Sequence, residues 1–485
     1  MENMKRHLKK YVCLLAITIL AGCDKYLEET PDNRVELDTP EKAAQLLTNA
    51  YTNAGYLFTE WMSDNVTFTR GTFKRPEYNQ AYQWQDFTAI EQDTPANFWT
   101  STYNGIAHAN EVLSVIDGLE GEKSLKDAVK GEAYLTRAYG HLMLVNLFSK
   151  HYNAQTASQD PGIPYVLEPE TEFIKQYSRG TVDDVYDNLE DDIQEGIDLV
   201  NGAFYSGSGK YHFTPNAALA LASRFYLFKG DWDNCIKYST QMLGADPSVF
   251  VKDISALLAL TANAEDFIRQ YTSPNDPSNL LVMRNITNFP VNVGYWPDQQ
   301  LFFGIFNTNP WDADDIRTSA EYPLYQRGDN GLTQGKYEFL FERTSLTSDV
   351  GVYYTIISAF RGEEVLLNRA ESYVYKNDLT AAIADLQIYI NKRYDGNPPL
   401  TLPLLRSYYG TNSNQFAVLS FILDERQKEF MHEGMRWFDI RRYDIPVEHT
   451  LENGSEVFLE EEDERKVLQL PQTALDVGGL EPNPR

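Results

Sequence analysis

Apolar residues recur at helical spacing in two long stretches of the chain. One helical stripe of residues 127–148 carries Tyr134, Leu135, Ala138, Leu142 and Val145. Residues 181–200 open with Thr181 and Asp184, the spacing of a capping box, and continue with apolar residues at steps of three and four. Only a helix places such positions on one side of an element. The pattern therefore predicts two long amphipathic helices.

Residues 215–243 and 361–394 look alike. Aligned at Asp231 and Asp378, both contain a helical segment, a Lys-Gly-Asp or Lys-Asn-Asp turn, and a second helical segment. Gly and Asn tolerate the left-handed conformation in which helices end, which is the logic of a tetratricopeptide-type (TPR) hairpin. A further helix is predicted at residues 417–432. Because no strict period joins these segments, we expect TPR-like hairpins within a larger body.

Residues 271–358 differ in kind from the helical segments. They are rich in Pro, Gly, Asn, Asp and aromatic residues, with short apolar runs at 280–283 and 352–357. Long ordered loops on a rigid scaffold are frequent binding sites, so we expect this region to bind the ligand. The sequence predicts a mainly α fold, in which TPR-like helical hairpins form a scaffold and a loop-rich region contains a few short strands.

The N-terminus has the features of an exported lipoprotein. Four basic residues precede an apolar run at 11–21, which at about 1.5 Å per residue is too short to cross roughly 30 Å of hydrocarbon. Residues 20–23 read Leu-Ala-Gly-Cys, and small residues before a cysteine are typical of lipoprotein cleavage sites. We predict a signal peptide at 1–22, lipid such as palmitate on Cys23, and a lipidated tether at 23–38.

Charge and cysteine usage narrow the remaining possibilities. The formal net charge of −28 argues against nucleic acid and anionic membrane surfaces as partners. Of the three cysteines, Cys13 leaves with the signal peptide and Cys23 carries lipid, so Cys235 has no disulfide partner. Residues 39–485 are long enough to bury a core without disulfide bonds, and we expect one domain there. The membrane is contacted through the lipid anchor only.

Four segments resemble the SusD-like (RagB/SusD) outer-membrane lipoproteins of the Bacteroidota. The most specific is residues 425–442, which read ERQKEFMHEGMRWFDIRR; residues 23–31, 131–138 and the tail from 470 to 484 support it. The resemblance covers essentially the whole mature chain. The acidic residues at 28 and 29 are similar to signals that send such lipoproteins to the outer face.

The resemblance implies a function in binding and delivery. It implies a helical fold built on TPR-like pairs, with a loop region that binds a nutrient, usually a glycan or oligosaccharide. It also implies a partner, a TonB-dependent SusC-like outer-membrane barrel over which the lipoprotein sits as a hinged lid. The expected location is the outer membrane, lipid-anchored and facing the cell exterior, and no enzymatic activity is implied.

Residues 433–442 crowd acids and bases together and invite a catalytic interpretation. Adjacency in sequence does not provide two carboxylates across a cleft, so no catalytic residue is predicted. Instead we expect Trp437 and Phe438 to pack into the body. The arginines are expected to fix the helix end through ion pairs, with Arg436 or Arg441 bound to Asp439 or Glu433.

Metal and nucleotide sites find no support in the sequence. The seven histidines form no i, i+4 pair and no HExxH motif, and no phosphate-binding glycine motif occurs. The acidic run 460–464 could hold a structural calcium ion, yet it lacks the alternating spacing that wraps one. We expect a solvated loop there, and no cofactor and no metal site.

Aromatic residues beside polar ones are the candidate ligand-binding residues. Sugars present apolar C–H faces next to hydroxyls, so a site needs an aromatic platform flanked by hydrogen-bonding groups. Two regions offer this mix, with Trp296 as the best single candidate. The predicted set is Trp61, Asp64, Asn65, Arg75 and Trp84 near the N-terminus, and Tyr295, Trp296, Trp311 and Asp312 in the loop-rich region.

Two other functions stay open from the sequence alone. One is a lipid-anchored glycan-degrading enzyme, and the other is a structural or assembly lipoprotein that binds only proteins. The nature of the ligand also stays open: a plant, host or microbial polysaccharide, an oligosaccharide or a peptide would each suit the sequence.

Overall fold

The computed structural model describes residues 37–69, 75–170, 172, 175–205, 209–291 and 294–485. The chain divides into two units, residues 1–38 and residues 39–485. The predicted signal peptide, the acylated Cys23 and nearly all of the predicted tether lie outside the described residues. All elements below belong to the second unit.

Helices are the main regular structure of the second unit. In the first half of the chain they are α3 (Pro40–Leu47), α4 (Pro76–Tyr82), α5 (Pro95–Val115), α6 (Lys123–Phe148), α7 (Val182–Leu199), α8 (Pro215–Lys229) and α9 (Trp232–Leu243). In the second half they are α10 (Ile254–Leu260), α11 (Ala264–Tyr271), α12 (Gln299–Phe306), α13 (Gly362–Tyr375), α14 (Leu379–Ile390), α15 (Leu402–Tyr408), α16 (Asn414–Glu429), α17 (Arg436–Arg442) and α18 (Gln472–Asp476). The mainly α fold predicted from the sequence is confirmed.

The ends of the helices follow the local sequence. The Thr181 hydroxyl accepts from the Asp184 amide while the Asp184 carboxylate accepts from the Thr181 amide, so the predicted capping box is present at α7. At the turn between α8 and α9, Gly230 adopts φ 73°, and Asn377 adopts φ 61° between α13 and α14. These are the left-handed positions that the two TPR-like turns require.

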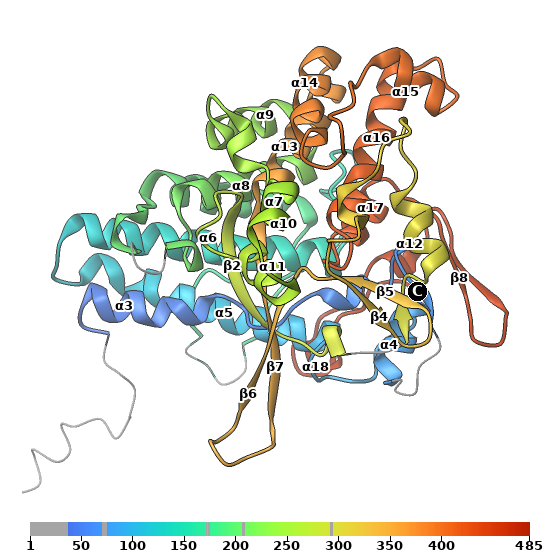
Figure 1. Cartoon of the computed structure of the whole chain (residues 1–485). Coiled ribbons are helices and arrows are strands. Elements are labelled where there is room, and N and C mark those ends of the chain that lie inside the picture. Colours follow the sequence, from blue (N-terminus) through green and yellow to red (C-terminus); the bar gives the residue numbers. More distant parts are fainter. Residues whose placement is uncertain (1–36, 70–74, 171, 173–174, 206–208, 292–293) are drawn as a thin grey trace, which may run out of the picture. The chain divides into compact units, whose positions relative to one another are not determined.

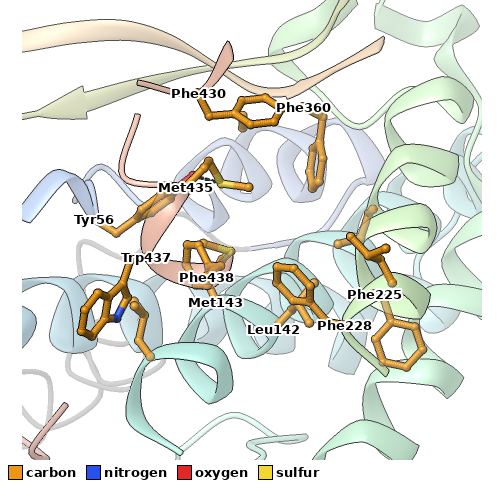
Figure 2. Close-up of a cluster of buried hydrophobic side chains, with 14 of the residues drawn as sticks. Tyr56, Leu142, Met143, Phe225, Phe228, Phe360, Phe430, Met435, Trp437 and Phe438 are labelled. Atoms are coloured by element: carbon orange, nitrogen blue, oxygen red, sulfur yellow. Dashed lines mark hydrogen bonds between the residues drawn. The ribbon is translucent and has the colours of Figure 1, made fainter. Parts of the chain in front are cut away.

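The helices pack side by side, mostly with their neighbours in the chain. Helix α5 lies against α6, α6 against α7, and α8 against α9, while α13 packs on α9, α14 and α16 (Figure 1). A continuous apolar core lies between them, which Figure 2 shows around Trp437 and Phe438 together with Leu142, Phe228 and Phe360. Cys235 is buried as a free thiol. The helices thus form the scaffold of the molecule.

The strands are short and antiparallel. They are β1 (Thr67–Phe68), β2 (Asn279–Ile286), β3 (Tyr295–Trp296), β4 (Leu324–Arg327), β5 (Gly331–Gln334), β6 (Glu338–Arg343), β7 (Gly351–Arg361), β8 (Val447–Thr450) and β9 (Glu456–Leu459). Strands β2, β7 and β6 form a three-stranded sheet in that order, and β4 pairs with β5. The β6–β7 hairpin extends away from the helices (Figure 1). Both apolar runs predicted as strands lie in this sheet, in β2 and β7.

Candidate functional site

A cleft of about 300 Å³ opens between α11, β3, the β4–β5 hairpin and β6. We call it the hairpin cleft. Its lining includes Glu265 and Arg269 of α11, Trp296 of β3, Tyr325 and Arg327 of β4, and the segment from Thr333 to Leu340. Most of this lining comes from the loop-rich region. Aromatic, cationic and acidic side chains therefore share one concave surface.

The β4–β5 hairpin brings its side chains against Trp296 because two glycines permit it. Gly328 adopts φ 58° in the turn, a conformation that side chains disfavour. A Cβ at Gly331 would lie 2.7 Å from the Arg327 carbonyl oxygen, closer than such atoms approach, and 3.0 Å from the Trp296 Cβ. The register pairs Arg327 with Gly331, so the Arg327 side chain stands where the hairpin meets β3.

Trp296 forms the floor of the hairpin cleft. Its ring packs edge-on against Phe289 at 4.8 Å and His432 at 5.4 Å, measured between ring centroids, and only 1% of the residue is exposed. Strand β3 is held in place by pairing with β1, where Thr67 lies opposite Trp296. The floor is therefore rigid, and aromatic anchors of this kind lose little entropy when a ligand arrives.

Arg327 lies over two rings. Its guanidinium carbon is 5.9 Å from the Trp296 ring centre and 5.8 Å from that of Tyr325, within cation–π distance. Burial lowers the pKa of Arg327 from its ordinary value. No hydrogen bond or ion pair joins this guanidinium to another residue of the described chain.

Three buried polar atoms in the lining of the hairpin cleft lack a partner among the described residues. They are Arg327 Nε, Gln334 Oε1 and the Tyr337 hydroxyl. An unsatisfied buried donor or acceptor costs roughly 1–3 kcal/mol, so a partner that reached any of these atoms would be favoured. Together they offer two donors and an acceptor beside aromatic faces, the complement of a hydroxylated ring.

Two larger hollows lie elsewhere, of about 580 and 790 Å³. The larger one contains Trp232 and Tyr375, whose rings stack on each other at 4.0 Å. Its arginines are already bound within the protein, Arg442 to Glu371 and Arg441 to backbone carbonyls, and Lys466 is bound to Asp444. The hairpin cleft is therefore the better candidate, because its polar groups are left for a ligand.

Metal binding has no donor set in the part of the chain that the structure describes. No group of three or more His, Cys, Asp or Glu side chains converges there. The acidic run at 460–464 instead includes Asp463, whose carboxylate binds the Arg465 guanidinium at 2.6 Å. None of the described helices combines the length and apolarity that spanning a bilayer would require.

Family comparisons agree with this architecture. A family described as "Starch-binding associating with outer membrane" matches residues 25–227, and one described as "SusD family" matches residues 333–469. The chain belongs to the SusD/RagB family. The second match contains residues 425–442, the segment that carried the resemblance in sequence.

Individual SusD-like relatives are distant in sequence and close in fold. SusD-like protein P2 of Formosa agariphila is 20% identical over 411 residues, covering 74% of this chain and 72% of the relative. A SusD superfamily structure from Bacteroides vulgatus has a TM-score of 0.69 at 17% identity and covers 92% of this chain and 98% of that one. A structure named as a laminarin binding SusD-like protein has a TM-score of 0.61 at 16% identity and covers 92% and 98%.

The structure brings the two predicted aromatic regions of this SusD-like chain together. Tyr295 and Trp296 pair with β1 from the N-terminal region. Trp61 packs against Phe289 at 5.4 Å, and Phe289 packs on Trp296, so both tryptophans share one buried cluster. In this arrangement Trp61 is 0% exposed.

The remaining N-terminal candidates bind other parts of the protein. Arg436 donates to the Asp64 carboxylate at 2.8 and 2.7 Å. Asn65 donates to buried Glu60 at 3.0 Å, and Arg75 pairs with Glu77 at 3.2 Å. The Trp84 indole donates to the Met62 carbonyl at 2.8 Å, and its ring stacks on His449 at a centroid distance of 4.5 Å.

Trp311 and Asp312 are not part of the hairpin cleft. The Trp311 indole donates to the Pro399 carbonyl at 2.9 Å, and its ring packs on Tyr394 and Phe421. Asp312 is exposed. Of the predicted ligand-binding set, only Trp296 lines the hairpin cleft.

Sequence reasoning missed Tyr325, Arg327 and Tyr337. A signal was present: Tyr325 and Arg327 are two residues apart before the glycine-rich turn at 328–331, and period two places both on one face of a strand. A hairpin prediction at this turn would have placed an aromatic and a cation side by side. Their contact with Trp296 depends on the tertiary fold.

The acid and base cluster at 433–442 is structural, but its predicted ion pairs are wrong. Trp437 and Phe438 are buried, as expected. Arg436 instead binds Asp64, and Arg441 donates to backbone carbonyls rather than to an acid. The other pairs are Asp439 with Arg426 and Arg442, and Glu433 with Arg361 and Lys336. The partners come from distant segments, which local spacing cannot reveal.

Proposed function

We propose that this SusD-like chain is a lipid-anchored glycan-binding protein of the outer membrane that faces the cell exterior. It captures a glycan or oligosaccharide in the hairpin cleft and delivers it to a TonB-dependent SusC-like barrel. Family membership supports the class of ligand, since one matching family is described as starch-binding and one structural relative as laminarin binding.

One observation supports the location of the ligand site in the hairpin cleft. In the hairpin cleft, unpartnered polar atoms stand beside aromatic rings, with Arg327 between Trp296 and Tyr325. A sugar ring can cover an aromatic face with its C–H groups while its hydroxyls bind the polar atoms. Binding would thus satisfy groups that the protein leaves unsatisfied, and this favours the bound state.

The chemistry of the hairpin cleft favours binding over bond cleavage. A glycosidase needs two carboxylates on either side of the scissile bond. The carboxylates of the described lining are Glu265 and Glu338, and Glu265 is bound to Arg269 at 3.2 Å. One carboxylate then remains, so the enzyme alternative gains no support from this site.

Tyr325→Ala tests the site directly. Tyr325 is half-buried at the cleft, so its loss removes an aromatic face with little effect on the core. We expect about tenfold weaker binding in calorimetry against a glycan chosen from an array, since stacking on an aromatic ring contributes roughly 1 kcal/mol or more. Trp296→Ala is less informative because the buried ring also supports the fold.

Tyr375→Ala is the matched control. Tyr375 is 43% exposed and stacks on Trp232 in the 790 Å³ hollow. We expect unchanged affinity in this variant. If Tyr375→Ala abolished binding while Tyr325→Ala bound normally, the ligand site would lie in that hollow and not in the hairpin cleft. If the protein binds no glycan and only other proteins, the structural alternative is correct.

Anchoring and delivery need separate tests. Mass spectrometry of the processed N-terminus is expected to find acyl chains on Cys23. Proteinase treatment of whole cells is expected to remove the protein, because it faces outward. Purification with the lipid anchor intact is expected to recover a TonB-dependent barrel, and its absence would contradict the delivery step.

A further inference from the structure

The charge of Arg327 stands out against the acidic character of the chain. The formal net charge is −28, so carboxylates are plentiful. Yet no carboxylate of the described residues lies within ion-pair distance of Arg327, and its Nε is buried without a hydrogen-bond partner. The residue is half-buried at the cleft, so its charge has no counter-charge among the described residues but can meet an opposite charge that a ligand brings into the cleft.

Other cationic side chains near the hairpin cleft are bound to carboxylates. Arg269, on the opposite wall, binds Glu265 at 3.2 Å. Arg317 binds Asp315 at 2.7 Å and Glu425 at 2.9 Å. Lys336 donates to the Glu429 carbonyl at 2.6 Å and to Glu433 at 3.3 Å. The position of Arg327 therefore differs from that of these neighbours in having no counter-charge among the described residues.

The rings below Arg327 set where a ligand would lie. Because the guanidinium is within 6 Å of both the Trp296 and Tyr325 rings, a sugar on the Tyr325 side would hold its substituents close to Arg327. Guanidinium binds carboxylate and sulfate oxygens through paired, charge-assisted hydrogen bonds. A neutral sugar would satisfy the hydrogen bonds of Arg327 and leave its charge unpaired.

We propose that the hairpin cleft selects an acidic glycan, with Arg327 binding a carboxylate or sulfate group of a sugar that contacts Tyr325. This inference rests on the proposed glycan-binding function and adds its specificity. Arg327 is the specificity-determining residue. Glu338 lines the same cleft and sets a limit on affinity, because its charge repels that of the ligand.

The experiment compares acidic glycans with neutral versions of the same backbone. The probes are oligogalacturonate and its carboxyl-reduced form, and a carrageenan oligosaccharide and its desulfated form, measured by calorimetry after an array of neutral and acidic glycans. We expect the wild-type protein to bind an acidic probe at least about tenfold more tightly than its neutral counterpart, given that hydrogen bonds to charged groups contribute roughly 1.5–3 kcal/mol. The two pairs distinguish a carboxylate from a sulfate.

Three variants assign the effect to residues. Arg327→Gln is expected to weaken binding of the acidic probe at least about tenfold more than binding of the neutral one, so that the preference for the acidic probe is lost. Glu338→Gln is expected to raise affinity for the acidic probe only. Arg269→Gln is the matched control, since Arg269 lines the same cleft but already binds Glu265, and we expect a change of less than about threefold.

Each outcome decides between the inference and the function on which it rests. If the array shows binding to neutral glycans alone, or if Arg327→Gln weakens both members of a pair equally, the inference is wrong and the glycan-binding function stands. If Arg269→Gln reduces the preference for the acidic probe as much as Arg327→Gln does, the preference comes from the overall electrostatic potential of the cleft and not from Arg327. If no glycan of the array binds, both proposals fail.

Discussion

A cluster of buried arginines and the half-buried Arg327 differ in how their charges are met in this SusD-like chain. One surrounds Glu429 on α16, whose carboxylate accepts from Arg393 at 2.7 Å, Arg361 at 3.0 Å and Arg317 at 3.4 Å. We call it the Glu429 cluster. The other is Arg327 in the hairpin cleft, with no partner among the described residues. The first is part of the fold, and the second is the arginine that we propose binds the ligand.

The contrast shows how the helical scaffold supports the loop-rich region. Arg361 ends β7 and Arg317 follows α12, whereas Glu429 ends the helix α16. Their ion pairs therefore fix the base of the loop-rich region to the helices. With that base fixed, the hairpin cleft can leave polar groups unsatisfied without losing its shape, because the stability comes from elsewhere.

The largest effect is expected from Glu429→Ala. Removing this carboxylate leaves the charges of Arg317, Arg361 and Arg393 buried without their common partner. Breaking a buried ion pair costs about 3–5 kcal/mol, and we expect a loss of at least that size in urea unfolding. The control is Asp127→Ala, which breaks an exposed pair with Lys123. Equal stability losses in the two variants would show that the Glu429 cluster does not anchor the loop-rich region.

Acid titration tests Glu425, a neighbouring carboxylate that shares Arg317 with the Glu429 cluster. Burial opposes ionisation of Glu425, but Lys428 and Arg317 overcome it and lower its pKa to about 2. Because the folded pKa is below the unfolded one, this carboxylate contributes its full stability above about pH 4.5 and loses it as the pH falls toward 2. We expect about 3 kcal/mol of stability to depend on it. The test measures the free energy of unfolding of wild type and Glu425→Gln at pH 7 and at pH 3. If the difference between the two proteins is not smaller at pH 3, the prediction is wrong.

The helical part of this molecule could be predicted from the sequence because its causes are local. Apolar spacing located α6 and α7, and the turn residues Gly230 and Asn377 marked the two hairpins. Capping at Thr181 depends on a residue only three positions away. Each of these features is decided within one or two turns of chain.

The site could be predicted only in part, because its causes are not local. The loop-rich region was recognised, and Trp296 proved to line the hairpin cleft. Aromatic content alone does not separate a buried ring such as that of Trp61 from a half-buried one such as that of Tyr325. Whether an arginine is paired depends on segments that meet only in the fold, as Arg436 and Asp64 do across 372 positions.

The pair of Asp64 and Arg436 is intermediate between the two groups of arginines. Asp64 keeps 29% of its side chain exposed while Arg436 keeps 9%. We expect Asp64→Asn to lower the free energy of unfolding by about 1–2 kcal/mol, between the values for exposed and fully buried pairs. Asp64 also remains a predicted ligand-binding residue. Unchanged stability combined with weaker glycan binding would assign it to the ligand and not to Arg436.

The smallest effect on stability is expected from Arg327→Ala. The variant loses cation–π contacts worth about 0.5–1 kcal/mol, and it also removes a charge whose burial is unfavourable, so the two changes oppose each other. We expect the free energy of unfolding to change by less than about 0.5 kcal/mol, within the range of ordinary surface substitutions. The free energy of unfolding of Arg327→Ala is measured in urea and compared with that of Glu429→Ala. A loss of several kcal/mol would place Arg327 with the structural arginines and remove the difference between the two groups, whereas a small gain would show that the fold holds this charge at its own expense.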